Sequence, residues 1–175
     1  MDELNNMWRN YLISDTYEPG STAKIITLTA ALEKGAVDSS SNFFCPGYKI
    51  VEDRRIRCSK TTGHGSQSLK EALMNSCNPA VMERGERTGV DGMYEYYHKL
   101  GLFSQSGIDL PGEANSIMHK KENVGPVELA TMSFGQSFQV TPIQFISAVC
   151  TVVNGGHTVT PHLGKRIIDS SKETI

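Results

Sequence analysis

The sequence lacks the features that mark several functional classes. Its 175 residues carry a net charge of −2 with acidic and basic side chains interspersed, so no basic surface of the kind that binds nucleic acid is expected. It has no apolar run of the roughly 18 residues that a membrane-spanning helix needs, and no signal peptide, repeat or low-complexity tract. We therefore expect a soluble chain without a nucleic-acid partner, and its 38% hydrophobic content suffices for a single core.

The most informative segment of the chain is Glu18-Pro19-Gly20-Ser21-Thr22-Ala23-Lys24, which offers a serine nucleophile and a lysine base. Pro19-Gly20 is a turn signal, and apolar residues at helical spacing follow it until Gly35, which predicts a helix that begins at Ser21. Residues three apart share a helix face, so the Lys24 amine should lie near the Ser21 hydroxyl. Free amides in the first turn favour negative charge developing there. This pair predicts an acyl-transfer enzyme.

A lysine can take the serine proton only when its amine is neutral. Lowering its pKa from a reference near 10.4 to a working value of roughly 7 to 8 takes about 3 units, or about 4 kcal/mol. Burial of Lys24 among Ile25, Ile26 and Leu28 would supply this shift. An S-x-x-K pattern also occurs by chance at the start of surface helices, so the function needs a second element.

That second element is Asn75-Ser76-Cys77-Asn78-Pro79. Ser68 and Glu71 form a capping box ahead of an apolar face, which predicts a short helix over 68–75, and the proline begins the next helix. Ser76 to Asn78 should then form a turn between helices with short polar side chains that border a cleft. The alternative is ordinary capping, since Ser and Asn favour helix ends.

Together the S-T-A-K and S-C-N segments resemble those of the penicillin-binding serine acyltransferases. The remaining segments agree in order and look like class B penicillin-binding transpeptidases, nearest to the stage V sporulation protein D type. They are Tyr17-Glu18-Pro19-Gly20-Ser21-Thr22, Gly63-His64-Gly65, Ser76-Cys77-Asn78-Pro79-Ala80, Gly107-Ile108-Asp109-Leu110-Pro111-Gly112-Glu113, Phe134-Gly135-Gln136 and Val140-Thr141-Pro142-Ile143-Gln144.

This resemblance implies a peptidoglycan D,D-transpeptidase that needs no cofactor for catalysis. Ser21 would be the acylated nucleophile, Lys24 its base and Ser76 the proton relay, while Asn78 would hydrogen-bond the substrate's backbone amide. The Ser21 amide would be one of two oxyanion-hole donors. The substrate implied is the D-alanyl-D-alanine end of a peptidoglycan stem peptide, and β-lactams would trap the same serine.

The chain also departs from the family pattern. Ala23 stands where a bulky residue is usual, and Ser137 where a glycine usually follows F-G-Q. The third motif, a lysine-threonine-glycine strand, is not reached before Ile175, and Lys60-Thr61-Thr62-Gly63 is best interpreted as a loop. We therefore expect residues 1–175 to be a partial transpeptidase domain without the C-terminal strands.

The resulting fold class is α+β, the helical portion of a penicillin-binding transpeptidase/β-lactamase-like fold with most of the central sheet missing. An apolar face left without that sheet invites self-association. The expected elements are helices over 21–34, 68–75, 79–88, 91–100, 127–134 and 141–154, and a small β-hairpin between 43 and 58.

Two of the four cysteines, Cys45 and Cys58, flank the predicted hairpin, which would bring their sulfurs together. They can form a disulfide, remain free thiols or bind a structural zinc ion. Zinc needs about two further ligands, for which His64 and Asp38 are the candidates. Cys150 lies in an apolar helix and is expected in the core, whereas Cys77 should point away from the cleft.

Two other functions stay open beside the transpeptidase. A β-lactam sensor domain would be acylated without turnover, and a non-catalytic interaction module would need no third motif. For the parent protein, the resemblance implies a membrane anchor, a place in a cell-wall synthesis complex, and work on the outer face of the cytoplasmic membrane.

Overall fold

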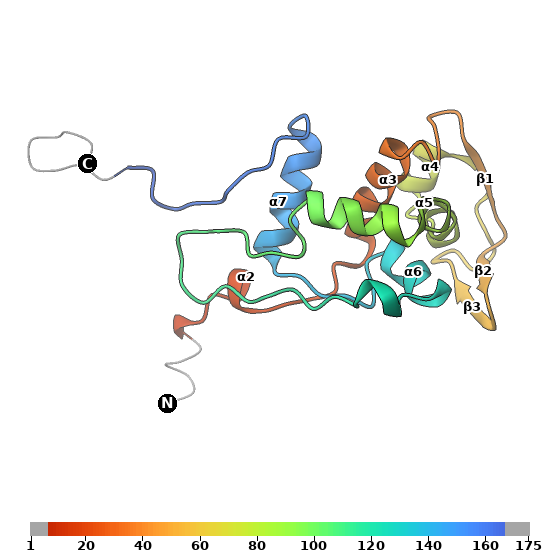
Figure 1. The fold of residues 1–175 in the computed structure, drawn as a ribbon. Helices are drawn as coiled ribbons and strands as arrows, with labels where there is room; N and C mark the ends of the chain where they lie inside the picture. Colours follow the sequence, from red (N-terminus) through yellow and green to blue (C-terminus); the bar gives the residue numbers. More distant parts are fainter. Residues whose placement is uncertain (1–6, 167–175) are drawn as a thin grey trace, which may run out of the picture.

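The computed structural model describes residues 7–166, in which helices form the body and four short strands lie at one end (Figure 1). The helices are α2 (Tyr11–Ser14), α3 (Lys24–Glu33), α4 (Leu69–Met74), α5 (Asn78–Lys99), α6 (Pro126–Ser133) and α7 (Pro142–Val153), with 3-10 turns η1 (Gly20–Ala23) and η2 (Lys121–Asn123). The strands are β1 (Asn42–Cys45), β2 (Tyr48–Val51), β3 (Arg54–Arg57) and β4 (Gly65–Ser68). This mixture confirms the expected α+β class, with helices predominant.

Local capping explains where several helices begin. The Ser68 hydroxyl accepts from the amide of Glu71, whose carboxylate accepts in return from the Ser68 amide, and this capping box starts α4 as expected. Thr141 and Gln144 form the same arrangement at α7. The two helices predicted over 79–88 and 91–100 are both present; they share the label α5 and are separated by a kink at Gly89, which has a φ of 74° and a ψ of 165°.

The core lies between α3, α5, α6 and α7. Its buried side chains come from all four helices and from the segments between them, and include Ile26, Met93, Tyr97, Leu102, Met132, Phe138, Val140, Phe145 and Ala148. A second, smaller cluster lies between α4, α5 and the strands and contains Cys45, Cys58, Ala72, Cys77 and Ala80. The smaller cluster includes Cys77 and Ala80, so it packs behind the turn that precedes α5, whereas the larger one contacts α5 through Met93 and Tyr97.

The strands form two small antiparallel sheets. The predicted hairpin is present as β2 paired with β3, from Tyr48 opposite Arg57 to Val51 opposite Arg54. The prediction missed that the preceding strand, β1, pairs with β4, with Cys45 opposite Gly65. Strand β4 reads Gly-Ser-Gln-Ser, which carries no apolar alternation, so it leaves no strand signal in the sequence.

Some large apolar side chains are exposed, among them Trp8 and Tyr11 near the N-terminal end of the described residues. None of the helices in residues 7–166 is both long and apolar enough to span a membrane.

Candidate active site

Ser21 lies on the exposed 3-10 turn η1, which leads directly into α3. The turn is held from behind by the loop after α6, because the Gly20 amide donates to the Gly135 carbonyl at 2.8 Å. The two backbones approach so closely that a Cβ on Gly135 would lie 2.1 Å from the Gly20 carbonyl oxygen. Only glycine fits at position 135, and the serine turn is thereby fixed against the helical core.

A second contact ties the same two loops together. A carboxylate oxygen of Glu18 accepts from the Ser137 amide at 2.9 Å. Ser137 has a φ of 65°, in the left-handed region that favours glycine. Such a backbone suits the glycine that the resemblance implies at this position, and the Ser137 hydroxyl donates to the Thr131 hydroxyl at 2.8 Å.

Lys24 begins α3 and its side chain is only 1% exposed. Its ammonium nitrogen, Nζ, donates to Oδ1 of Asn78 at 2.6 Å, to the Ser76 hydroxyl at 2.8 Å and to the Ser76 carbonyl at 2.6 Å. Three of the four residues predicted for catalysis are therefore joined directly. The Ser21 hydroxyl makes no hydrogen bond within residues 7–166 and lies one turn before Lys24, open to solvent.

The pKa of Lys24 lies below its ordinary value because burial penalises the charged ammonium. Negative charge on Cys58 or Cys77 acts in the opposite direction, but burial outweighs it. The direction is the one that the sequence predicts for a lysine that must accept a proton.

In the turn between α4 and α5, two side chains face Lys24 and the one between them faces the smaller core cluster. Ser76 has a φ of 49°, and its side chain and that of Asn78 meet Lys24. The Asn78 side-chain amide also donates to the Arg57 carbonyl at 3.2 Å, which anchors the turn to β3. Cys77, between them, is fully buried and points away from Lys24, as expected, into the smaller core cluster.

Behind the turn, four potential metal ligands converge. The ligand atoms of Cys45, Cys58, His64 and Cys77 all lie within 4.8 Å of one another, and all these cysteines are free thiols. The Cys58 sulfur is 3.5 Å from Nδ1 of His64 and 4.0 Å from the Cys77 sulfur. We call this group the thiol cluster.

The structure corrects one predicted ligand of this group. Asp38 lies outside the thiol cluster, in an exposed turn where its carboxylate accepts from Ser40 and Ser41. Cys77 takes the fourth place instead. The sequence offered a signal for this, since Cys77 follows directly on a residue of the predicted cleft and was expected to face backwards, but nothing in the spacing showed that it meets Cys58.

Hydrogen bonds from the backbone favour negative charge on one of these sulfurs. Burial alone would raise the pKa of Cys58, but amide donors from Lys60 and Asn78 outweigh it and hold this pKa below the ordinary value. Burial raises the pKa of Cys77, and negative charge on Cys58 acts in the same direction.

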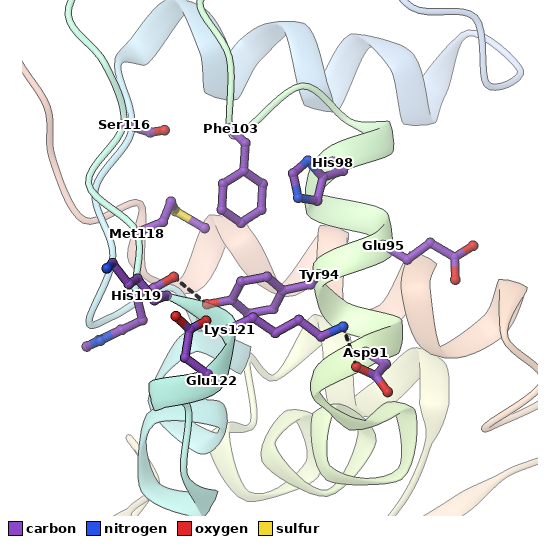
Figure 2. Close-up of a pocket in the computed structure, with 11 residues that line it drawn as sticks. Asp91, Tyr94, Glu95, His98, Phe103, Ser116, Met118, His119, Lys121 and Glu122 are labelled. Carbon is purple, nitrogen blue, oxygen red and sulfur yellow. Dashed lines mark hydrogen bonds and ion pairs between the residues drawn. The ribbon is translucent and has the colours of Figure 1, made fainter.

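A roomy concavity of the described residues lies elsewhere, between α5 and the segment 116–122 (Figure 2). Several of its polar groups are already paired with each other, as Figure 2 shows: Lys121 with Asp91 at 2.5 Å, and the Tyr94 hydroxyl with the His119 carbonyl at 2.7 Å. It contains neither Ser21 nor Lys24, so this concavity is not part of the candidate active site, which lies at the serine turn.

Known proteins resemble this chain along nearly its whole length. Residues 2–175 match the family model of the penicillin-binding protein transpeptidase domain. Stage V sporulation protein D of Bacillus subtilis is 47% identical over 169 residues, which are 95% of this chain and 26% of that protein. The peptidoglycan D,D-transpeptidase MrdA of Acinetobacter baumannii is 28% identical over 173 residues, 93% of this chain and 26% of that protein.

Solved structures agree with the fold. A peptidoglycan synthetase from Bifidobacterium adolescentis superposes with a TM-score of 0.90 at 24% identity, over 99% of this chain and 32% of that one. PBP2 of Pseudomonas aeruginosa gives a TM-score of 0.85 at 28% identity, over 95% of this chain and 42% of that one. The chain spans about a quarter of the length of the curated relatives named above, and it belongs to the penicillin-binding protein transpeptidase domain family.

Proposed function

We propose that the protein to which this chain belongs is a serine D,D-transpeptidase that acts on the D-alanyl-D-alanine end of peptidoglycan stem peptides and is acylated by β-lactams. The observation that carries the proposal is the buried Lys24 amine, held by Ser76 and Asn78 one turn after the exposed Ser21. The names of the relatives support it.

In the proposed reaction, neutral Lys24 takes the proton of the Ser21 hydroxyl while the Ser21 oxygen attacks the carbonyl carbon of the scissile amide. The Ser21 backbone amide is proposed to donate to the developing oxyanion. As the carbon–nitrogen bond breaks, the proton passes from Lys24 through the Ser76 hydroxyl to the leaving amine. The Asn78 side chain is the proposed partner of the substrate's backbone amide.

An amine of a neighbouring strand then attacks the acyl carbon and forms the new amide bond, the ester bond to the Ser21 oxygen breaks, and the proton of the amine passes to that oxygen through the same groups. Metal or cofactor chemistry has no part in these steps.

Covalent labelling of the full-length parent by a fluorescent penicillin tests the nucleophile. We expect Ser21→Ala to abolish the label and Ser76→Ala to slow it, because the relay residue is not acylated. Ser66→Ala is a matched control, since this serine is exposed on β4, and it should label like the wild type. Retained labelling of Ser21→Ala would overturn the assignment.

We infer that residues 1–175 are a partial transpeptidase domain whose other wall comes from the rest of the parent. The coverage of about a quarter of the relatives' length supports this. The 175-residue chain alone should then acylate little, because each missing oxyanion-type donor is worth roughly 2.7 to 4 kcal/mol in comparable sites. Rapid acylation of the isolated chain would instead favour completion of the site by a second copy.

Within the family, the 47% identity to a stage V sporulation protein D favours a role in sporulation. We propose a membrane-anchored parent that works on the outer face of the cytoplasmic membrane within a cell-wall synthesis complex. A sensor that is acylated without turnover is distinguished by measuring product release, which only the transpeptidase shows.

We also propose that the thiol cluster binds a structural zinc ion through Cys45, Cys58, His64 and Cys77. Zn–S bonds of about 2.3 Å and Zn–N bonds of about 2.0 Å in a tetrahedron place two sulfurs about 3.8 Å apart, and a sulfur and a nitrogen about 3.5 Å apart. The separations of 4.0 Å and 3.5 Å measured from Cys58 are close to these values. A disulfide between two of these cysteines, or four free thiols, are the alternatives.

Metal analysis with thiol counting on the purified chain separates these alternatives. Zinc predicts about one equivalent of metal at neutral pH, released as pH falls towards about 5 because the ligands must lose protons to bind. Cys58→Ser should cost the metal, whereas Cys150→Ser should not, since Cys150 lies on α7 outside the cluster. A mass 2 units below the fully reduced value, with no metal, would establish a disulfide instead.

A further inference from the structure

One short segment has a net charge opposite in sign to that of the whole chain. Residues 48–60, which form β2, β3 and the start of the loop after them, contain five basic and two acidic residues, a net charge of +3, whereas the chain carries −2. Two of the basic side chains, Lys49 and Arg54, have a carboxylate partner. The other three are exposed and make no ion pair within residues 7–166; they are Arg55, Arg57 and Lys60.

The register of the hairpin places two of these arginines on its outer face. Tyr48 lies opposite Arg57 and Ile50 lies opposite Arg55, so these four side chains share one face of the β2–β3 pair. The opposite face includes the buried Val51 and packs against helices α5 and α6. Ile50 is 63% exposed, as expected for the outer face. We call Tyr48, Ile50, Arg55 and Arg57 the basic face.

The basic face has the groups that an acidic peptide requires. The guanidinium of Arg55 lies 3.9 Å over the Tyr48 ring, a contact that restrains an otherwise flexible side chain. Guanidinium groups present N–H donors in a planar fork that matches the two oxygens of a carboxylate. Tyr48 and Ile50 add apolar surface beside the charge. This combination fits a peptide carboxylate together with the apolar atoms of its own chain.

The same strand reaches the candidate active site. The Arg57 carbonyl accepts from the Asn78 side-chain amide at 3.2 Å, and the Asn78 oxygen accepts from Lys24 at 2.6 Å. Asn78 is the proposed partner of a backbone amide of the substrate. A peptide strand held there therefore passes next to β3, and an acidic residue in that strand meets a positive potential.

We propose that the basic face is a subsite for an acidic residue of the peptide strand held at Asn78, with Arg55 and Arg57 as the partners of its carboxylate. The subsite rests on the proposed transpeptidase function and adds a preference for negative charge upstream of the D-alanyl-D-alanine end. Charge complementarity and the contact of β3 with Asn78 favour this ligand. An anionic membrane would use the same charges but not the contact with Asn78.

The test uses the full-length parent and pairs of peptides that end in D-alanyl-D-alanine. The two members of a pair differ only in a glutamate or a glutamine upstream of that end, and the position of this residue changes from pair to pair. Each peptide competes with a fluorescent penicillin for labelling of the wild type. We expect the glutamate peptide of at least one pair to compete about 3- to 10-fold more strongly, the scale of one or two exposed charge-assisted contacts. Equal competition in every pair would overturn the subsite.

Substitutions at the basic face locate the preference. Arg55→Gln combined with Arg57→Gln removes both charges and keeps polar side chains, so the advantage of the glutamate peptide should disappear. The ratio between the two peptides of a pair is the readout, because a general loss of folding or activity affects both. Arg9→Gln removes an exposed arginine just before α2, which lies apart from β3 (Figure 1), and should leave the ratio unchanged. An equal change there would assign the effect to net charge and overturn the subsite.

Direct binding separates the subsite from the proposed reaction. The fluorescence anisotropy of a dye-labelled glutamate peptide measures its binding to the Ser21→Ala parent, which lacks the proposed nucleophile. If penicillin does not label the wild type, the proposed reaction is wrong, but peptide binding that the double arginine variant weakens still supports the subsite. Normal labelling without a glutamate preference overturns only the subsite. Vesicles that contain phosphatidylglycerol are the second probe: if the double variant loses vesicle binding while both peptides compete equally, the basic face binds an anionic membrane instead.

Discussion

The serine site, formed by Ser21, Lys24, Ser76 and Asn78, and the thiol cluster share one three-residue turn, yet each has a buried cationic side chain nearby in a different environment. At the serine site, Lys24 is held by the neutral oxygens of Ser76 and Asn78, and burial lowers its pKa. On the cluster side, Arg84 is equally buried; its guanidinium lies over the Phe43 ring and 3.8 Å from the carboxylate of Glu83. A buried lysine can lose its proton, and the neutral amine can then act as a base. An arginine cannot lose its proton in this way, so Arg84 keeps its charge and is paired with the carboxylate of Glu83.

The largest effect that would break this comparison is expected at Lys24. Lys24→Met removes the base and should slow acylation of the full-length parent by a fluorescent penicillin about 10²- to 10⁴-fold, the usual worth of a positioned general base. Lys24→Arg should be as slow, because a guanidinium stays charged. If the arginine variant acylated at the wild-type rate, Lys24 would serve only as a positive charge.

The next effect concerns the cluster. Cys77→Ser keeps the size of the side chain but loses a thiolate ligand, and we expect a loss of about 3 kcal/mol or more in the free energy of unfolding, as for other losses of a bound metal. Chemical denaturation in the presence of zinc measures it. Cys150→Ser, outside the cluster, is the control and should change stability by less than about 1 kcal/mol. Equal stability of the two variants would argue against a structural metal.

A third prediction concerns pH. Because burial lowers the pKa of Lys24, the rate of acylation should rise with pH through a midpoint below the ordinary lysine value of 10.5. A rate profile with a midpoint at or above 10.5 would show that Lys24 is not the base.

The lowered pKa of Lys24 also makes the free energy of unfolding depend on pH. Between the lowered pKa of folded Lys24 and 10.5, the unfolded chain binds more protons than the folded chain, so the contribution of this group to stability rises with pH across that window. Lys24→Met should flatten this dependence in denaturation curves measured at several pH values.

The smallest effect is expected at the loop behind the serine turn. Ser137→Gly relieves a left-handed backbone worth about 1 to 2 kcal/mol but loses the hydrogen bond to Thr131, worth about 1 kcal/mol. The free energy of unfolding should therefore change by less than about 1 kcal/mol. Calorimetry measures it, and a large loss would mean that the Ser137 hydroxyl does more than support its own loop.

Much of the serine site could be predicted, because the signals that begin its helices lie within a few residues of one another in the sequence. The turn signal before Ser21, the capping box at Ser68 and the proline after Asn78 depend on neighbours a few residues away, and the helices begin close to where these signals put them. The burial of Lys24 followed from its apolar neighbours. The meeting of Lys24 with Ser76 and Asn78 came from the family resemblance.

By itself, the sequence predicted the helices, the family and the residues proposed for the serine site, because capping signals, spacing and ordered motifs lie in short stretches of chain. Only the tertiary structure decided which side chains surround the cysteines. In the structure Asp38 lies outside the cluster and Cys77 lies within it. These contacts depend on the pairing of β1 with the polar strand β4 and on its packing against α5, which no local pattern encodes.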